Sequence, residues 1–200
     1  MLVDKQQNHV NVSVYQKAKK GNYYCGDSYY FKETDEAFVC ALADGLGSGE
    51  LARDSSQAVM DVIEENPPLT VEALVKKCNE ALMGKRGVVL GVLRIDFQTD
   101  TYSYSSIGNI GVITIDSEGK RSRSIPLAGY LAGYPRDLRV TRGKVHKGMK
   151  FLMFSDGVND RRLSKHITEA RSVDYITEEY KQLYGQARED DTTLIAMEYE

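Results

Sequence analysis

The chain has 200 residues, 42% of them hydrophobic and 28% charged, and its formal net charge is −3. These values are typical of a globular protein and argue against general binding to nucleic acid or to membrane surfaces. A chain of this length suits a single domain, which we predict to span residues 1–200. The N-terminal stretch holds no apolar signal core, and no run approaches the ~18 apolar residues of a membrane span, so we expect a cytoplasmic protein.

The cysteines and histidines form no pattern that suggests disulfides, zinc binding or a Ser-His-Asp triad. The cysteines are odd in number and lack Cys-x-x-Cys spacing, which predicts reduced residues that pack in the interior. The histidines form no ligand pair and flank none of the acidic positions discussed below. These residues are Cys25, Cys40 and Cys78, and His9, His146 and His166.

In its first half the chain alternates between strand-like and helical patterns. Alternating polarity and short apolar runs predict the strands, and apolar residues at helical spacing predict two helices. Pro67-Pro68 stops the first helix, and Thr70 offers an N-cap to the second. The predicted elements are strands at 10–14, 28–31 and 38–43 and helices at 51–66 and 71–84.

The second half is rich in strands joined by short connections, which predicts antiparallel pairing. A stretch rich in Gly, Ala and Tyr at 127–134 predicts a loop that packs rather than a regular element. The predicted elements are strands at 88–97, 101–107, 111–115, 151–154 and 193–199, a hairpin turn at 116–119 and a helix at 173–184.

Asp44 lies at the centre of this organisation, because it follows the apolar run 38–43 and precedes glycines at 45, 47 and 49. It is therefore placed where a buried strand surfaces, ahead of backbone that can bend sharply. Such an acid can hold a metal ion, and the carbonyl oxygen of Gly45 can reach the same ion. An acid that merely caps a turn also fits this stretch.

Known nucleotide and cofactor motifs fit the same stretch poorly. A dinucleotide fingerprint that starts at Gly45 requires a glycine where Glu50 stands, and no Gly-Lys-Ser/Thr follows to make a P-loop. A methyltransferase-like Asp-x-Gly-x-Gly-x-Gly is a nearer alternative, but its acid would fall on Ala43. The register of that motif is therefore off by one residue.

Acids recur at other predicted strand ends. Asp27 precedes the second strand, Asp156 follows the apolar run 151–154, and Asp190-Asp191 stands directly before the last strand. A sheet can gather such residues into one cleft, where their charges repel unless a hard divalent cation such as Mg²⁺ or Mn²⁺ binds among them. Taken singly, each of these acids also fits a turn.

Together these positions resemble the PPM (type 2C) protein Ser/Thr phosphatases, and in particular their SpoIIE-type bacterial branch, over residues 25–197. The resemblance implies an α+β fold, an αββα four-layer sandwich of two antiparallel sheets flanked by helices. The motifs that carry it are Cys25-Gly26-Asp27-Ser28, Ala43-Asp44-Gly45-x-Gly47-x-Gly49, Gly108-Asn109, Ser155-Asp156-Gly157 and Arg188-x-Asp190-Asp191-x-Thr193.

The resemblance also implies a site for two Mn²⁺ or Mg²⁺ ions at one edge of the sandwich. Asp44 would bridge both ions, with the carbonyl of Gly45 on one of them. Asp156 and Asp190 would hold the first ion, and Asp27 would serve the second through water. The catalytic residues would be Asp44, Asp156 and Asp190, and water activated between the ions would hydrolyse phosphoserine or phosphothreonine.

The string from Ala43 to Gly49 and residues 79–86 resemble the phosphatases of bacterial stressosomes. This implies phosphorylated STAS-domain proteins as partners and a role in resetting a general stress response. Two other functions remain as alternatives: a catalytically silent binding module with the same fold, and an S-adenosylmethionine-dependent methyltransferase. The intact acids disfavour the silent module, which has no reason to keep them.

Two positions depart from the pattern of the larger relatives. Those proteins hold phosphate with an Arg upstream of the first motif, whereas this chain has only Lys17, Lys19 and Lys20 before Gly26. Their Glu-Asp pair is Gly26-Asp27 in this chain, as in the SpoIIE-type branch. These departures bear on how phosphate and the second ion would be held.

Two further expectations concern charged residues. Because consecutive residues near a strand start point to opposite sides, we expect Asp190 to face the cleft as a ligand and Asp191 to orient the loop. Residues 136–150 carry six basic residues against one acidic residue. This segment either steers an acidic phosphoprotein toward the site or forms a solvated edge strand.

Overall fold

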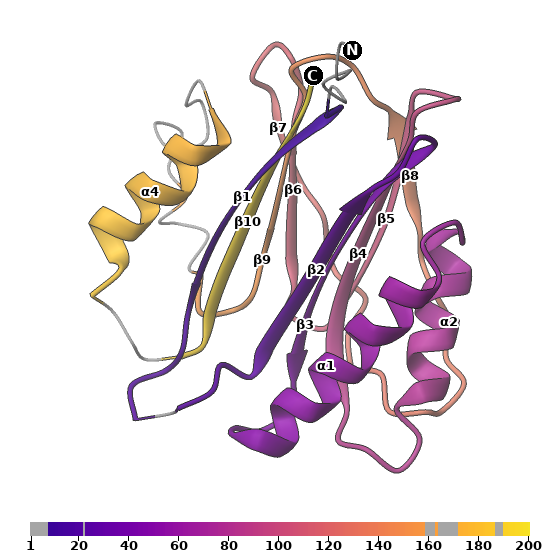
Figure 1. Cartoon of the computed structure of the whole chain (residues 1–200), viewed down its shortest axis with the longest axis vertical. Coiled ribbons are helices and arrows are strands. Elements are labelled where there is room, and N and C mark those ends of the chain that lie inside the picture. The colour runs from indigo at the N-terminus through magenta and orange to yellow at the C-terminus, as the bar shows by residue number, and fades with distance from the viewer. Residues whose placement is uncertain (1–7, 22, 159–162, 164–171, 187–189) are drawn as a thin grey trace, which may run out of the picture.

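Figure 1 shows the computed structural model of the chain, which describes residues 8–21, 23–158, 163, 172–186 and 190–200. Most of the N-terminal stretch, His166 and Arg188, on which the sequence analysis drew, lie outside the described residues. The strands form two five-stranded sheets in which every pairing is antiparallel. The two sheets face each other, as Figure 1 shows.

The first sheet has the order β1-β10-β9-β6-β7, and the second has the order β2-β3-β4-β5-β8. In the first sheet the strands are β1 (Val10–Lys17), β10 (Thr192–Tyr199), β9 (Lys150–Phe154), β6 (Gly111–Ile115) and β7 (Arg121–Arg123). In the second they are β2 (Asp27–Glu33), β3 (Ala37–Gly45), β4 (Val88–Asp96), β5 (Thr101–Ile107) and β8 (Thr141–Lys144).

Helices cover the outer faces of both sheets (Figure 1). Helices α1 (Glu50–Glu65) and α2 (Val71–Ala81) pack on the second sheet, and α4 (Val173–Tyr184) packs on the first. The sidechain of Thr70 caps α2 by accepting a hydrogen bond from the backbone N–H of Ala73 at 3.3 Å, as its sequence predicts. The αββα sandwich is therefore confirmed.

Three apolar layers hold the sandwich together. One fills the space between the sheets, the second lies between β3, β4 and the helices α1 and α2, and the third lies between the first sheet and α4. Strand β3 contributes to two of them, with Leu42 in the inter-sheet layer and Ala41 and Ala43 against the helices. Both faces of β3 are buried, which explains why its sequence is an unbroken apolar run rather than an alternating one.

The short connection between β5 and β6 does not form the hairpin that the sequence predicts. β5 belongs to the second sheet and β6 to the first, so the chain changes sheets at residues 108–110. Gly108 makes this possible with φ +83°, and a Cβ there would lie only 2.1 Å from a methyl carbon of Val89. The prediction of antiparallel pairing is wrong for these two strands and is confirmed for β4–β5 and β6–β7.

The basic segment 136–150 includes β8, an exposed strand at the edge of the second sheet. Lys144 pairs in register with Thr101 at one end of β5. Ile107, at the other end of β5, pairs with Leu90. Leu90 is next to Val89, which is the partner of Asp44. Six residue steps of β5, roughly 20 Å, separate these ends. This part of the segment is therefore an edge strand remote from Asp44, and it does not run toward the acidic edge.

The structure also bears on the expectations about the cysteines, the loop at 127–134 and membrane-spanning helices. The cysteines Cys25, Cys40 and Cys78 are buried and unpaired within the described ranges, in agreement with packing roles. The loop at 127–134 packs by forming bridges from Leu127 to Ile107 and from Leu131 to Val88. None of the helices in the described part of the chain is long and apolar enough to cross a membrane.

Candidate metal centre

The pairing of β2 with β3 places two of the predicted acids directly opposite each other. Asp27 and Asp44 are partners in the register of these antiparallel strands. Gly45, next in the chain, packs against the backbone of α1, where a Cβ would lie 1.9 Å from the carbonyl oxygen of Ala52. Only a glycine fits at this position, and its close contact with α1 fixes the backbone beside Asp44.

Asp27 is the most deeply buried of the acids, with 1% of its surface exposed. The Thr193 hydroxyl on β10 donates a 2.7 Å hydrogen bond to its Oδ2, so this contact joins the two sheets. Its Oδ1 is buried and has no hydrogen-bond partner among the described residues. Burial is the main reason that the pKa of Asp27 rises to about 6, although the hydroxyls of Thr193 and Ser155 oppose the rise.

Asp44 is the focus of the electrostatics. Burial is the largest of the causes that raise its pKa to about 8, and the neighbouring carboxylates of Asp27, Asp156, Asp190 and Asp191 supply the rest of the rise. Each of these acids comes from a strand end or a loop, and together they come from both sheets. The fold therefore gathers the predicted acids at one edge, where their mutual repulsion is a property of the site.

Asp156 follows β9 and is exposed. The Asn109 amide donates a 2.6 Å hydrogen bond to its Oδ2, which leaves its Oδ1 for another partner. Burial and the charge of Asp190 raise the pKa of Asp156. A cavity of about 450 Å³ opens beside it and is lined in part by Phe154 and Val158.

Asp190 and Asp191 lie in different environments, as their predicted roles require. The buried carboxylate of Asp191 accepts hydrogen bonds from the backbone N–H of Lys19 and of Gly26, both at 2.8 Å. Asp190 is exposed, and its Oδ1 lies 3.8 Å from the ammonium of Lys19. Asp191 thus ties the loop before Asp27 to the start of β10, while the side chain of Asp190 stays open to a ligand.

Two observations indicate that these residues suit a divalent cation. The orphaned Oδ1 of Asp27 and the raised pKa of Asp44 are both relieved when a cation binds among the carboxylates. Within the described ranges, no three Asp, Glu, His or Cys side chains already converge as ligands of one ion. The remaining ligands would come from the carbonyl of Gly45 and from water, which hard cations accept readily.

Three residues with a clear structural role at this edge were given none by the sequence analysis. Thr193 bonds to Asp27, and its backbone N–H donates a 2.9 Å hydrogen bond to the Ser155 hydroxyl. Asn109 orients Asp156. All three lie inside the motifs quoted above, so a signal was present, but spacing along the chain does not reveal contacts between separate strands.

Comparison with solved structures defines the class of fold. The structure of RsbX in complex with magnesium superposes with a TM-score of 0.91 at 35% identity and covers 98% of both chains. The catalytic domain of the serine threonine protein phosphatase PstP, in complex with two manganese ions, superposes with a TM-score of 0.78 over 94% of this chain and 97% of that one. That second likeness, at 16% identity, concerns the fold alone. The architecture is that of the PPM phosphatases.

Sequence comparison defines the family. Residues 35–200 match the family model of Stage II sporulation protein E (SpoIIE). Phosphoserine phosphatase RsbX of Bacillus subtilis (strain 168) is 36% identical over 195 residues, which cover 98% of this chain and 98% of that protein. The chain therefore belongs to the SpoIIE family of PPM-type domains.

Proposed function

We propose that this protein is a metal-dependent protein phosphatase that hydrolyses phosphoserine or phosphothreonine on regulatory proteins of a bacterial stressosome. Its substrates would be phosphorylated STAS-domain proteins, and it would act in the cytoplasm to reset a general stress response. The observation that carries the proposal is the gathering of acids from three other segments around Asp44, with the pKa of Asp44 raised to about 8. The similarity to RsbX, named a phosphoserine phosphatase, supports the choice of reaction.

In this proposal each acid has its own role. Asp44 would bridge two Mn²⁺ or Mg²⁺ ions, Asp156 and Asp190 would hold the first ion, and Asp27 would serve the second through water. The carbonyl of Gly45 would complete the set. When bound, the ions supply an activated water and offset the charge on the phosphoryl oxygens.

The surrounding residues would keep these ligands in place. The Thr193 hydroxyl fixes one oxygen of Asp27 and leaves the other for the metal-bound water. The Asn109 amide fixes one oxygen of Asp156 and would leave the other for the first ion. Asp191 holds the backbone before Asp27 through Gly26. Such supporting contacts set ligand orientation and commonly affect metal affinity by about 10- to 100-fold.

The test is phosphate release from a phosphorylated STAS-domain protein, first with Mn²⁺ and then with excess EDTA. We expect turnover only with the metal, and none in Asp44→Asn. Asp61→Asn, an exposed acid on α1, is the matched control and should retain full activity. Metal-independent turnover would contradict the mechanism, and binding of the phosphoprotein without turnover at any metal concentration would favour a silent binding module.

A further inference from the structure

An exposed apolar patch lies beside the acidic edge. Tyr130, Tyr134 and Met83 leave 51%, 78% and 75% of their surfaces exposed, although large apolar side chains are usually covered. Tyr130 and Tyr134 come from the packed loop at 127–134, and Met83 follows α2. With Leu46 and Arg86 these residues form what we call the docking patch.

Close packing over two glycines brings members of the docking patch together. A Cβ on Gly87 would lie 2.5 Å from the Tyr130 ring and 2.9 Å from the side chain of Leu46, so both side chains cross that glycine. The backbone of Met83 packs on Gly133, where a Cβ would lie 2.9 Å from the Cα of Met83. These contacts join Leu46 to Tyr130, and Met83 to the residue before Tyr134, on the same loop at 127–134.

The docking patch also adjoins the candidate metal centre. Leu46 lies two residues after Asp44, and its backbone N–H donates a 2.8 Å hydrogen bond to the carbonyl of Gly87. The guanidinium of Arg86 covers Gly47, where a Cβ would lie 2.3 Å from Nη1. A protein surface seated on the patch would therefore be next to the acidic edge and close to the positively charged guanidinium of Arg86.

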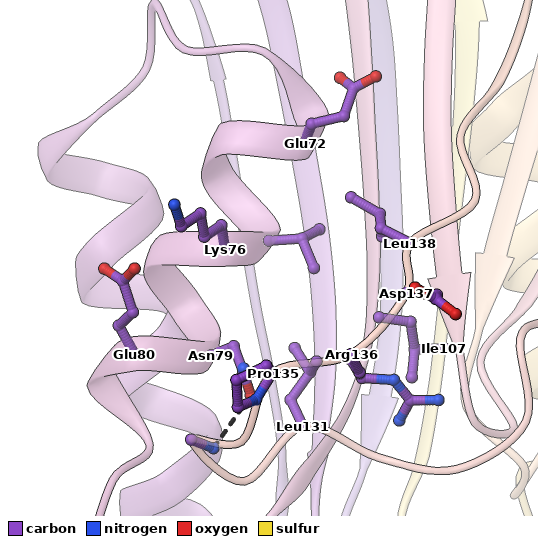
Figure 2. A pocket seen from close by; sticks show the side chains of 12 residues that line it. Glu72, Lys76, Asn79, Glu80, Ile107, Leu131, Pro135, Arg136, Asp137 and Leu138 are labelled. Carbon is purple, nitrogen blue, oxygen red and sulfur yellow. Dashed lines mark hydrogen bonds between the residues drawn. The ribbon is translucent and has the colours of Figure 1, made fainter.

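Hydrogen bonds hold the patch in a defined shape. The Asn79 side chain on α2 donates to the carbonyl of Tyr134 at 2.7 Å and accepts from the backbone N–H of Ala132 and Gly133 at 3.2 and 3.0 Å. Figure 2 shows Asn79 directed from α2 toward this loop. Leu131 adds two backbone hydrogen bonds to Val88. A surface that is already ordered loses little entropy when a partner binds.

The composition of the patch points to a protein partner. Tyr, Met and Arg are enriched in protein–protein interfaces, and Tyr and Arg are frequent among the residues that dominate their binding energy. Behind the patch, a groove of about 430 Å³ separates α2 from the chain at 131–138, with Val75, Ile107 and Leu138 on its walls (Figure 2). Arg86 supplies the positive charge that suits a segment bearing a phosphate.

We propose that the docking patch binds the folded surface of the phosphoprotein substrate next to its phosphorylated residue. This inference rests on the proposed function, because it names how that substrate is recognised. In this proposal a small phosphate ester at the acidic edge would not need the patch, whereas a folded phosphoprotein would cover it. The patch would therefore determine the preference for a protein substrate without taking part in the chemistry.

The test compares two substrates, a phosphorylated STAS-domain protein and p-nitrophenyl phosphate, in the Mn²⁺-loaded enzyme. For the pair Tyr130→Ala/Tyr134→Ala we expect kcat/KM on the phosphoprotein to fall by about ten-fold or more, as for dominant interface residues. Hydrolysis of p-nitrophenyl phosphate should not change. Tyr175→Ala, an exposed tyrosine on α4 at the other side of the sandwich, is the matched control and should affect neither substrate.

Two further measurements keep the outcome decisive. Tyr134→Ala alone removes a side chain that is mostly solvated, so it tests the patch even if the double variant unfolds. Binding of the phosphoprotein in EDTA, without turnover, tests docking independently of catalysis. The proposal would be overturned by equal losses of activity on both substrates, or by phosphoprotein binding that does not change in the patch variants. It would also be overturned if the wild type forms a dimer that Tyr134→Ala dissociates, because a second copy of the chain would then occupy the patch. Failure of the Mn²⁺-loaded wild type to release phosphate from either substrate would instead refute the proposed function.

Discussion

Replacing Asp44 by Asn should stabilise the metal-free protein while it removes activity. The pKa of Asp44 rises from 3.8 to about 8 on folding, so the folded state resists ionisation of this group. Between these values the unfolded chain loses a proton that the folded chain keeps, and the stability of the wild type falls as pH rises. Asparagine has nearly the same shape and no charge, so the variant lacks this loss.

The structure sets the size of the effect. One pKa unit corresponds to about 1.4 kcal/mol, so the full shift of Asp44 gives an upper limit of about 6 kcal/mol above pH 8. Because Asp44 keeps contact with solvent, the effective dielectric is higher and we expect on the order of 2–3 kcal/mol. For a chain of this length that is a rise in Tm of roughly 5–10 °C.

Thermal unfolding in EDTA at pH 5 and pH 8, for both proteins, measures the effect directly. The difference in Tm should be large at pH 8 and smaller at pH 5, since the loss of stability accumulates between the two pKa values and pH 5 lies only about one unit above the lower one. Added Mn²⁺ should stabilise the wild type and leave Asp44→Asn almost unchanged, because only the wild type binds the ion tightly. A variant with a Tm equal to or below that of the wild type at pH 8 would refute the electrostatic argument.

Three further predictions concern the other charged residues. Asp27→Asn should keep some activity, which high Mn²⁺ partly restores in a metal titration, and unrestorable loss would contradict its contact through water. Asp190→Ala should abolish turnover with little change in Tm. Asp191→Ala should lower the Tm, because the buried N–H of Gly26 loses its acceptor at a cost of about 1–3 kcal/mol and the part-buried N–H of Lys19 loses its acceptor as well. The reverse pattern would exchange their roles. Glu substitutions at Arg142 and Lys144 should leave kcat/KM on the phosphoprotein unchanged at low salt, and a loss there would restore the steering interpretation.

Local patterns in the sequence predicted most of the elements correctly. The run before Asp44, the stop of α1 before Pro67, the Thr70 cap of α2 and the alternation of β1 each depend on residues close in the chain, and the structure confirms them. Helix α2 ends at Ala81, three residues before the predicted end. The short strand β7 was not predicted, because three exposed residues show no alternation to detect. Its pairing with β6 follows from the turn at 116–119, where Asp116 accepts from nearby backbone N–H groups.

Contacts between residues distant in the chain were harder to predict from the sequence. The sequence predicted that the acids would meet, but not that Asp27 stands opposite Asp44 or that Thr193 fixes it across the two sheets. The change of sheet at Gly108 was missed because a short connection usually makes a hairpin. The docking patch was also beyond reach, since it depends on Tyr130 and Leu46 meeting over Gly87.

The pairing of β1 with β10 has a consequence for the synthesis of this protein. These strands join Val10 to Tyr199 and Lys17 to Thr192, and Thr193 completes the surroundings of Asp27. While the ribosome is still adding residue 180, the second sheet with Asp27 and Asp44 is already translated, but Asp190 does not yet exist. Because contacts of such long sequence separation form slowly, the final strand closes the fold and the metal site in the same late event. A chain that ends before residue 190 would therefore lack both strand β10 of the first sheet and the acid at position 190.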